Sequence, residues 1–184
     1  MTFNKKKIVA WAKIIIISYC SIGIILFYLQ DLFIFLPKKL STDHLFRFDF
    51  PFEEVFIPVN REDTISLLKF LPEGKLRKGV VIYYHGNTNN VEHYAIHSKI
   101  FTKSGYEVWM QDYPGYGKSR GDRTEQKLYD QAMIIRNMAA GKFSADSTIV
   151  YGRSLGSGIA GYVASMSHCK HLVLETPYYS IPAL

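Results

Sequence analysis

The pattern of apolar residues separates one long uncharged run from a region of shorter, alternating segments. Residues 14–29 form sixteen positions without a charge, directly after Lys13. This is slightly short of the roughly 20 residues that span a bilayer, but apolar residues continue on both sides. Trp11 and Tyr28 are suited to the two membrane interfaces. We therefore predict an uncleaved signal anchor, in which residues 1–37 form a tail and one transmembrane helix.

Three alternatives to a signal anchor stay open for this run. A cleaved signal peptide is disfavoured because no small-x-small cleavage site follows the apolar core. A lipoprotein site at Cys20 is disfavoured because the bulky Tyr19 precedes it and more apolar residues follow. A buried core helix is the third alternative.

Basic residues flank the run on both sides and bear on its orientation. Four lysines precede it and three basic residues follow it: Lys5, Lys6, Lys7 and Lys13 against Lys38, Lys39 and Arg47. The mild bias predicts a cytoplasmic N-terminus with the rest of the chain outside. We interpret the first three lysines as a topology determinant, with specific lipid binding as the alternative.

The remainder of the chain alternates between strand and helix patterns after a polar and aromatic linker at residues 38–51. This order predicts a mixed sheet that is parallel after an opening hairpin, with helices on both faces. The expected strands are residues 55–59, 64–71, 80–84, 106–111, 148–151 and 171–174, and the expected helices are residues 90–104, 124–140 and 155–166.

Composition changes this picture little. The net charge of +6 could indicate a nucleic-acid surface, but four of the 22 basic residues lie among the first 13 positions, where there is no acid. We therefore expect the bilayer, and no nucleic acid, as a partner. Cys20 and Cys169 lie in the span and in the soluble part, so they should not pair. No metal-ligand spacing or nucleotide fingerprint is present, so no cofactor is expected.

Three motifs follow three of the predicted strands. They are His85-Gly86-Asn87, the Asp112-Tyr-Pro-Gly-Tyr-Gly-Lys-Ser loop, and Gly152-Arg153-Ser154-Leu155-Gly156. Ligands bind at the carboxyl ends of strands in open parallel sheets, so these motifs should meet at one edge. The last reads Gly-x-Ser-x-Gly between a strand and a helix, which is the context of a nucleophile elbow.

With these motifs in this order, residues 52–184 resemble the first two-thirds of a domain of the α/β-hydrolase superfamily. Glu175-Thr-Pro after the last strand adds to the match. Within the superfamily the chain is similar to membrane-anchored serine hydrolases with a single span. These include bacterial proteins of unknown substrate and eukaryotic relatives that remove palmitate from proteins.

The resemblance implies a role for each motif residue. Ser154 would be the nucleophile, and the backbone N–H groups of Leu155 and Asn87 would form the oxyanion hole. The other residues would support the site without moving protons: His85, Gly86, Asp112, Gly152, Arg153 and Gly156. The implied reaction is hydrolysis of a carboxylic ester or thioester in an acylated or amphiphilic substrate. Four tyrosines are candidates either for packing or for lining an acyl pocket: Tyr113, Tyr116, Tyr178 and Tyr179.

The chain departs from the family at the catalytic triad. The order in this fold is Ser, then Asp or Glu, then His, but the only carboxylate after Ser154 is Glu175, and His168 and His171 both precede it. These histidines should lie at the far end of the last strand, while His44, His93 and His97 fall in the linker and in the helix after the oxyanion loop. We therefore expect no triad acid or histidine in this chain and interpret the sequence as incomplete at its C-terminus. The alternative is an inactive membrane-tethered pseudohydrolase or binding module.

Overall fold

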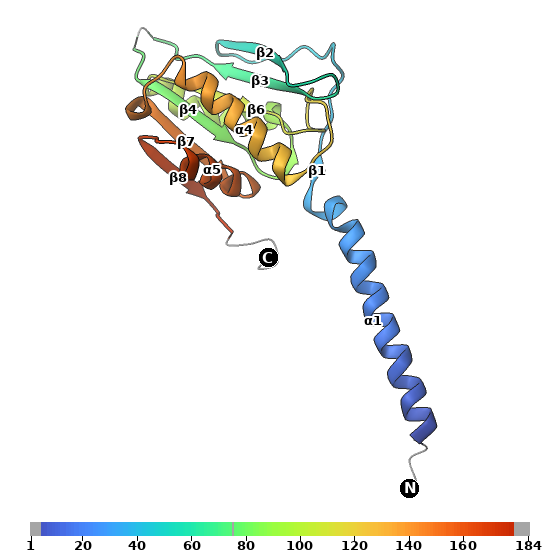
Figure 1. The fold of residues 1–184 in the computed structure, drawn as a ribbon. Helices are drawn as coiled ribbons and strands as arrows, with labels where there is room; N and C mark the ends of the chain where they lie inside the picture. The colour runs from blue at the N-terminus through green and yellow to red at the C-terminus, as the bar shows by residue number, and fades with distance from the viewer. Residues whose placement is uncertain (1–4, 75, 179–184) are drawn as a thin grey trace. The chain divides into compact units, whose positions relative to one another are not determined.

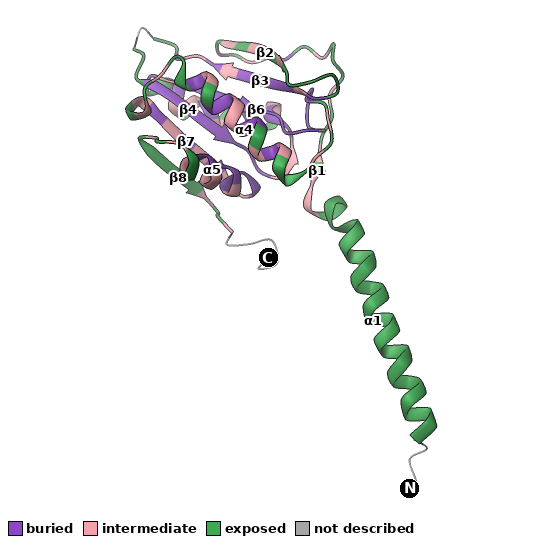
Figure 2. Cartoon of the chain, viewed as in Figure 1, coloured by how far each residue is buried: buried purple, intermediate pink, exposed green. Residues whose placement is uncertain are grey.

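The computed structural model describes residues 5–74 and 76–178, which form two compact units, Met1–Leu36 and Pro37–Leu184. The first unit is the helix α1 (Lys5–Ile34), in which every residue with an assigned burial is exposed or half-buried (Figure 2). It is long and apolar enough to cross a membrane by length and composition. An apolar helix is therefore present at the N-terminus, as predicted.

The second unit contains a six-stranded sheet in the order β2-β3-β6-β4-β7-β8 (Figure 1). Strands β2 and β3 form the expected antiparallel hairpin, and β3 pairs antiparallel with β6. Strands β6, β4, β7 and β8 run parallel. The six strands are β2 (Phe52–Pro58), β3 (Thr64–Phe70), β4 (Gly79–Tyr84), β6 (Tyr106–Gln111), β7 (Thr148–Arg153) and β8 (His171–Glu175).

Helices cover both faces of the sheet. The long helices α4 and α5 lie beside each other on one face (Figure 1), where the Tyr84 hydroxyl donates to the Ala132 carbonyl of α4. On the other face, Val91 and Tyr94 pack in one core cluster with Val81 and Met110 of the sheet. The helical segments of this unit are α2 (Val91–Tyr94), the 3-10 turns η1 (Ala95–His97) and η2 (Ala145–Ser147), α3 (Ser98–Lys103), α4 (Glu125–Ala140) and α5 (Leu155–Met166).

Most expected elements differ from the observed ones by one or two residues at an end, and two differ by more. The helix predicted over residues 90–104 is interrupted by the 3-10 turn η1, because Ser98 Oγ donates to the Ala95 carbonyl and so competes with regular helical bonding. The first strand begins at Phe52 rather than residue 55. The charge of Glu54 in this strand is paired with Lys118, whose Nζ donates to Glu54 Oε1 at 2.8 Å. Lys118 lies 64 positions away, so the local sequence does not show this partner.

Residues 38–51, which we expected to be a linker, pack on the domain. Phe46 and Phe50 belong to the core cluster with Phe70. The unit begins within the two-residue strand β1 (Leu36–Pro37), and a second short strand, β5 (Thr88–Asn89), follows the loop after β4.

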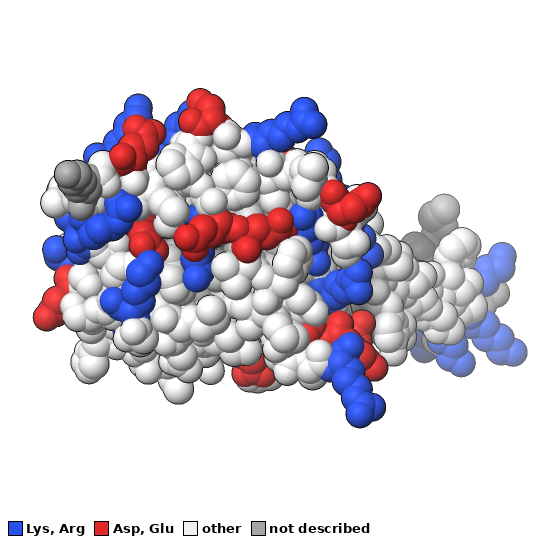
Figure 3. Space-filling view, turned by 90° about the horizontal axis from the view of Figure 1, so that it is seen from above, with Lys and Arg blue, Asp and Glu red and all other residues white. Residues whose placement is uncertain are grey.

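Surface charge on the domain is mixed. Seen from above, acidic and basic side chains are interspersed among uncharged ones (Figure 3). On this face they form no continuous basic surface of the kind that tracks a nucleic-acid backbone.

Candidate active site

Ser154 occupies the sharp turn between β7 and α5. Its φ is 50° and its ψ is −119°, a conformation that residues other than glycine rarely adopt. The Ser154 N–H donates to the Glu175 carbonyl at 2.9 Å, so the neighbouring strand β8 holds the turn in place. The backbone is strained at the one residue that the Gly-x-Ser-x-Gly motif singles out.

The two glycines of the motif let the turn close. A Cβ on Gly152 would overlap the Gly156 carbonyl oxygen and lie 2.6 Å from the Ala160 Cβ. A Cβ on Gly156 would overlap the carbonyl oxygen of Tyr84, on the neighbouring strand β4. Helix α5 therefore begins in direct contact with the sheet, and only glycine fits at these two positions.

The start of α5 can serve as one side of an oxyanion hole. The Ser157 N–H and hydroxyl both donate to the Ser154 carbonyl, at 2.8 Å and 2.6 Å, and so fix the first helical turn. The N–H groups that precede this bond, at the very start of the helix, have no helical carbonyl before them to bond to, and they point along the helix axis. The Leu155 N–H, directly after the serine, belongs to this group.

The loop after β4 lies beside the serine. A Cβ built on Gly86 would be 3.7 Å from the Ser154 Cβ, so this loop and the elbow meet at the carboxyl edge of the sheet. The backbone of Asn87, next in the chain, is anchored from the other side, since its carbonyl accepts the Tyr116 hydroxyl at 2.7 Å.

Tyr113 and Tyr116 hold this loop by donating their hydroxyls to its backbone carbonyls. Both are fully buried, and the Tyr113 hydroxyl donates to the His85 carbonyl at 2.7 Å. They pack within the site rather than line a surface pocket. Tyr178, another candidate for an acyl pocket, lies against α5, because a Cβ on Gly158 would be 2.5 Å from its hydroxyl; Tyr179 lies outside the described residues.

His85 and Asp112 are both fully buried, with His85 Nε2 at 3.8 Å from Asp112 Oδ1. The His85 Nδ1 donates to the Gly86 carbonyl at 2.7 Å, which leaves Nε2 as the unprotonated nitrogen. Burial lowers the pKa of His85 to about 4. Burial raises the pKa of Asp112 to about 7, although backbone hydrogen bonds from Val91 and Lys118 oppose this. Between about pH 4 and pH 7, burial therefore favours a neutral pair over a buried ion pair.

Asp112 organises its own loop. Its Oδ1 accepts the Val91 N–H at 2.8 Å, at the start of α2. A Cβ on Gly117, whose φ is 47°, would overlap the Asp112 carboxylate. The Asp112 carbonyl accepts the Ser119 hydroxyl at 2.7 Å. The glycine in the Tyr-Gly-Lys-Ser segment is therefore required by the carboxylate that begins the loop.

Arg153 connects the elbow to two residues that the sequence pattern does not place in the site. Its Nη1 donates to Nε2 of His97 at 3.0 Å, and its Nε lies 3.5 Å from Oε1 of Glu175. The Tyr151 hydroxyl also donates to Glu175, at 2.7 Å. Burial, followed by the Arg153 charge, lowers the pKa of His97. The register of β7 on β8, which pairs Arg153 with Glu175, is the signal that could have located this cluster.

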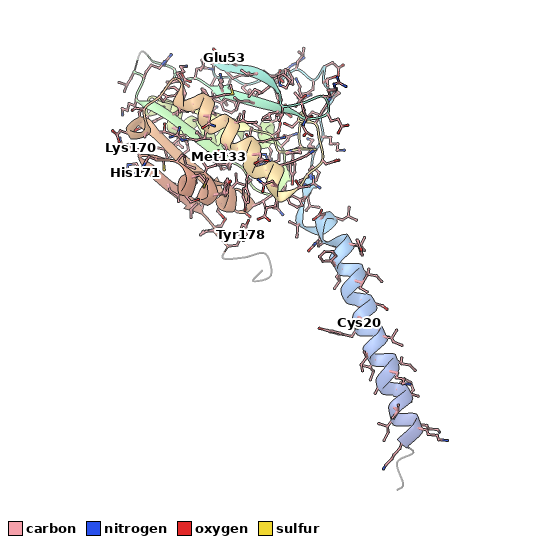
Figure 4. All side chains as sticks on the ribbon, in the orientation of Figure 1. Cys20, Glu53, Met133, Lys170, His171 and Tyr178 are labelled. Carbon is pink, nitrogen blue, oxygen red and sulfur yellow. The ribbon has the colours of Figure 1, made fainter. Side chains whose placement is uncertain are left out.

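The histidines after Ser154 lie away from it. His171 pairs with Ile149 at the beginning of β7 and β8. Figure 4 shows it away from Tyr178, which follows the other end of β8. His168 is near Arg136, which donates to its carbonyl. Among residues 5–74 and 76–178, no histidine is hydrogen-bonded to the Ser154 side chain, and no cluster of three or more His, Cys, Asp or Glu side chains could hold a metal ion.

Comparison with known proteins agrees with this geometry. The family model Hydrolase_4, serine aminopeptidase S33, matches residues 75–184. Human protein ABHD12B is 29% identical over 115 residues, which are 58% of this chain and 32% of that protein. The uncharacterized membrane protein YNL320W of Saccharomyces cerevisiae is 30% identical over 125 residues, which are 65% of this chain and 44% of that protein. The lysophosphatidylserine lipase ABHD12 of Danio rerio is 28% identical over 110 residues, which are 55% of this chain and 28% of that protein. The chain thus spans less than half the length of these relatives.

Solved structures show the same fold. A structure described as a lipase in open form matches with a TM-score of 0.59 and 23% identity over 67% of this chain and 44% of that one. A thermostable carboxyl esterase from Bacillus coagulans matches with a TM-score of 0.56 and 24% identity, over 67% and 43%. The expected α/β-hydrolase fold is therefore confirmed, and the chain belongs to the Hydrolase_4 family (serine aminopeptidase, S33) of α/β hydrolases.

Proposed function

We propose that this chain carries the nucleophile and oxyanion hole of a membrane-associated serine hydrolase that cleaves a carboxylic ester or thioester. The observation that supports this most directly is the backbone of Ser154, which is left-handed at the start of α5 and closely packed through Gly152 and Gly156. A loop serine that merely fits a Gly-x-Ser-x-Gly pattern has no reason to keep such strain.

In this proposal the Ser154 Oγ attacks the carbonyl carbon of the substrate and forms a tetrahedral intermediate. The N–H groups of Leu155 and Asn87 donate to the oxygen that becomes negative. Collapse of the intermediate expels the alcohol or thiol and leaves an acyl-serine, which water then hydrolyses. The serine proton needs a base, and we assign neither the histidine nor the acid of a triad to a residue of this chain.

The proposed substrate is acylated or amphiphilic. Two observations support this class: the apolar helix α1 is long enough to hold the domain at a bilayer, and several similar proteins are named as lipases or esterases. We further propose that the N-terminus is cytoplasmic and the hydrolase domain lies outside. Protease digestion of intact cells or right-side-out vesicles tests this orientation, because it should degrade the domain without permeabilisation.

A fluorophosphonate probe tests the nucleophile. The full chain in non-ionic detergent should become labelled, and Ser154→Ala should abolish the label. Ser165→Ala is the matched control, because Ser165 is exposed on the same helix and its hydroxyl donates within that helix, to the Tyr162 carbonyl. The Ser165→Ala variant should label at the parent rate.

The second candidate function is a membrane-tethered binding module without catalysis. It is favoured by the position of His168 and His171 at the far end of the sheet from Ser154. Cooperative unfolding together with no labelling of the parent chain would establish this alternative and refute hydrolase activity for the chain.

A further inference from the structure

We propose that Asn90 is a positioning residue for the oxyanion loop, because it ties that loop to the segment that follows the candidate membrane helix. The inference rests on the proposed function, since it concerns the Asn87 N–H as an oxyanion donor. It adds a residue and a connection that the nucleophile motif does not contain.

The side chain of Asn90 uses both ends of its amide. Only 1% of the residue is exposed. Its Oδ1 accepts the His93 N–H at 3.3 Å and caps α2. Its Nδ2 donates to the Lys38 carbonyl at 3.1 Å. Serine, threonine or aspartate could provide the cap, but among these side chains only the amide of asparagine has its acceptor and its donor on two separate atoms, so that one caps α2 while the other reaches Lys38.

The backbone of Lys38 is joined both to the oxyanion loop and to the loop of residues 112–119. Its N–H donates to the Asn89 carbonyl at 2.9 Å, and its carbonyl accepts the Gly117 N–H at 3.0 Å as well as the Asn90 amide. The next bond along the segment runs from the Leu40 N–H to the Gly117 carbonyl at 2.8 Å. The segment 38–40 therefore lies along the loop of residues 112–119 and is clamped to the end of the oxyanion loop.

These hydrogen bonds form a closed circuit next to the proposed donor, because they join the oxyanion loop, Lys38 and the loop of residues 112–119 to one another. Asn87 lies two residues before Asn89, and its carbonyl accepts the hydroxyl of Tyr116, which is adjacent to Gly117. The chain directly after the Asn87 N–H is thus held by Tyr116 at the Asn87 carbonyl and by the Lys38 clamp at Asn89 and Asn90. An oxyanion donor must point at a fixed position to stabilise the transition state, and small displacements are costly.

Lys38 also lies close to the candidate span along the sequence. It follows the last residue of α1, Ile34, by four positions, which is at most about 14 Å of extended chain. Residues 38–40, which follow α1 in the sequence and belong to the domain, are therefore part of the support for the site.

Two variants of Asn90 test the proposal in the full-length chain in detergent. Asn90→Asp keeps the cap acceptor and loses the donor to Lys38. Asn90→Ser keeps a cap acceptor without adding charge, and lacks the second polar atom with which Asn90 contacts Lys38. Asn137→Asp, at an exposed position near the end of α4, is the control for the change in charge. The readouts are the rate of fluorophosphonate labelling per folded molecule, kcat and KM for a short-chain p-nitrophenyl ester, and amide hydrogen exchange at residues 87–89.

We expect both Asn90 variants to lower the labelling rate and kcat about tenfold with KM within twofold of the parent. This is less than the 10²–10³-fold loss from removing an oxyanion donor outright. Exchange at residues 87–89 should accelerate, and Asn137→Asp should change none of these quantities. A merely structural role would lower the melting temperature but leave kcat per folded molecule unchanged.

Parent-like labelling and exchange in both variants would overturn the proposal. Failure of both variants to fold would also overturn it, because Asn90 would then serve the fold and not the loop. If the parent chain does not label at all, the proposed function fails, and the exchange at residues 87–89 alone decides whether Asn90 positions the loop.

Discussion

Replacing His85 by asparagine should make the free energy of unfolding depend on pH between about 4.5 and 6.5. In this range the His85–Asp112 pair of the parent protein contributes no pH dependence. His85 and Asp112 are buried 3.8 Å apart. Burial lowers the pKa of His85 from 6.5 to about 4 and raises that of Asp112 from 3.8 to about 7. At pH 5 to 6 the unfolded chain therefore has a charged histidine and a charged aspartate, whereas the folded chain has neither.

The two contributions have opposite signs. The lowered pKa of His85 gives stability that is present above about pH 6.5 and is lost as pH falls through about 4. The raised pKa of Asp112 gives stability that is present below about pH 3.8 and is lost as pH rises through about 7. Each slope is about 1.4 kcal/mol per pH unit. Between roughly pH 4.5 and 6.5 both states bind one proton on this pair, so the slopes cancel.

When either partner is removed, the contribution of the other to the pH dependence of the free energy of unfolding is no longer cancelled. In His85→Asn the amide can still donate to the Gly86 carbonyl, and the free energy of unfolding should fall by roughly 2–3 kcal/mol, relative to the parent, between pH 4.5 and 6.5. In Asp112→Asn it should rise by a similar amount over the same range. The double variant should be parallel to the parent, whatever constant loss of stability the substitutions cause.

Chemical unfolding of the full chain in non-ionic detergent measures these profiles. The indole of Trp109 is buried and donates to Glu107, so its fluorescence reports on the core. A Trp11→Phe background removes the second tryptophan, on α1, from the signal.

A His85→Asn profile parallel to that of the parent would refute the reasoning. If the folded state held a charged His85 and a charged Asp112, the parent would also be flat in this range, but relative to the double variant it would lose stability as pH falls below about 3.8, where the unfolded aspartate takes up a proton and the paired one does not. A neutral pair shows no such loss, so the difference between the parent and the double variant below pH 3.8 distinguishes the two.

Three further substitutions have defined outcomes. Gly156→Ala should destabilise the chain by about 3 kcal/mol or more in chemical unfolding, since its Cβ would overlap the Tyr84 carbonyl; a loss below about 0.5 kcal/mol would contradict this close contact. Ser154→Gly should be about 1 kcal/mol more stable than Ser154→Ala, because glycine relieves the strain at φ 50°; the reverse order would mean that the turn is unstrained. Tyr116→Phe should cost about 1–3 kcal/mol and slow fluorophosphonate labelling, because the partly buried Asn87 carbonyl loses the Tyr116 hydroxyl as a donor; unchanged labelling would separate this bond from the oxyanion loop.

Much of the fold can be predicted from local pattern. The predicted bounds of the strand 106–111 and the helix 155–166 match the structure to the residue, because Gly105 and the elbow mark their starts and both have a clear apolar face. Parallel strands bring their carboxyl ends to one edge, so the meeting of the Gly86 and Ser154 loops also follows from the sequence.

What cannot be predicted depends on contacts between distant positions. The role of Tyr116 beneath Asn87 joins residues 29 positions apart, and the bond between Arg153 and His97 joins residues 56 positions apart. Nothing in the local pattern distinguishes a loop tyrosine that packs from one that donates to a specific carbonyl. Similarly, the 3-10 turn before α3 arises from a hydroxyl that competes for one carbonyl, an effect smaller than the helical periodicity that surrounds it.

The place of β6 between β3 and β4 imposes an order of assembly on the growing chain. The β2–β3 hairpin is complete at Phe70, but the strand that covers its inner edge is not synthesised until residues 106–111. Pairing over such a separation is slow, and an uncovered strand edge can pair with other chains. During synthesis the inner edge of the hairpin, on β3, therefore has no strand to pair with until β6 has been made. Substitutions that slow the formation of the β4–β6 pair should then reduce the yield of folded protein more than its final stability.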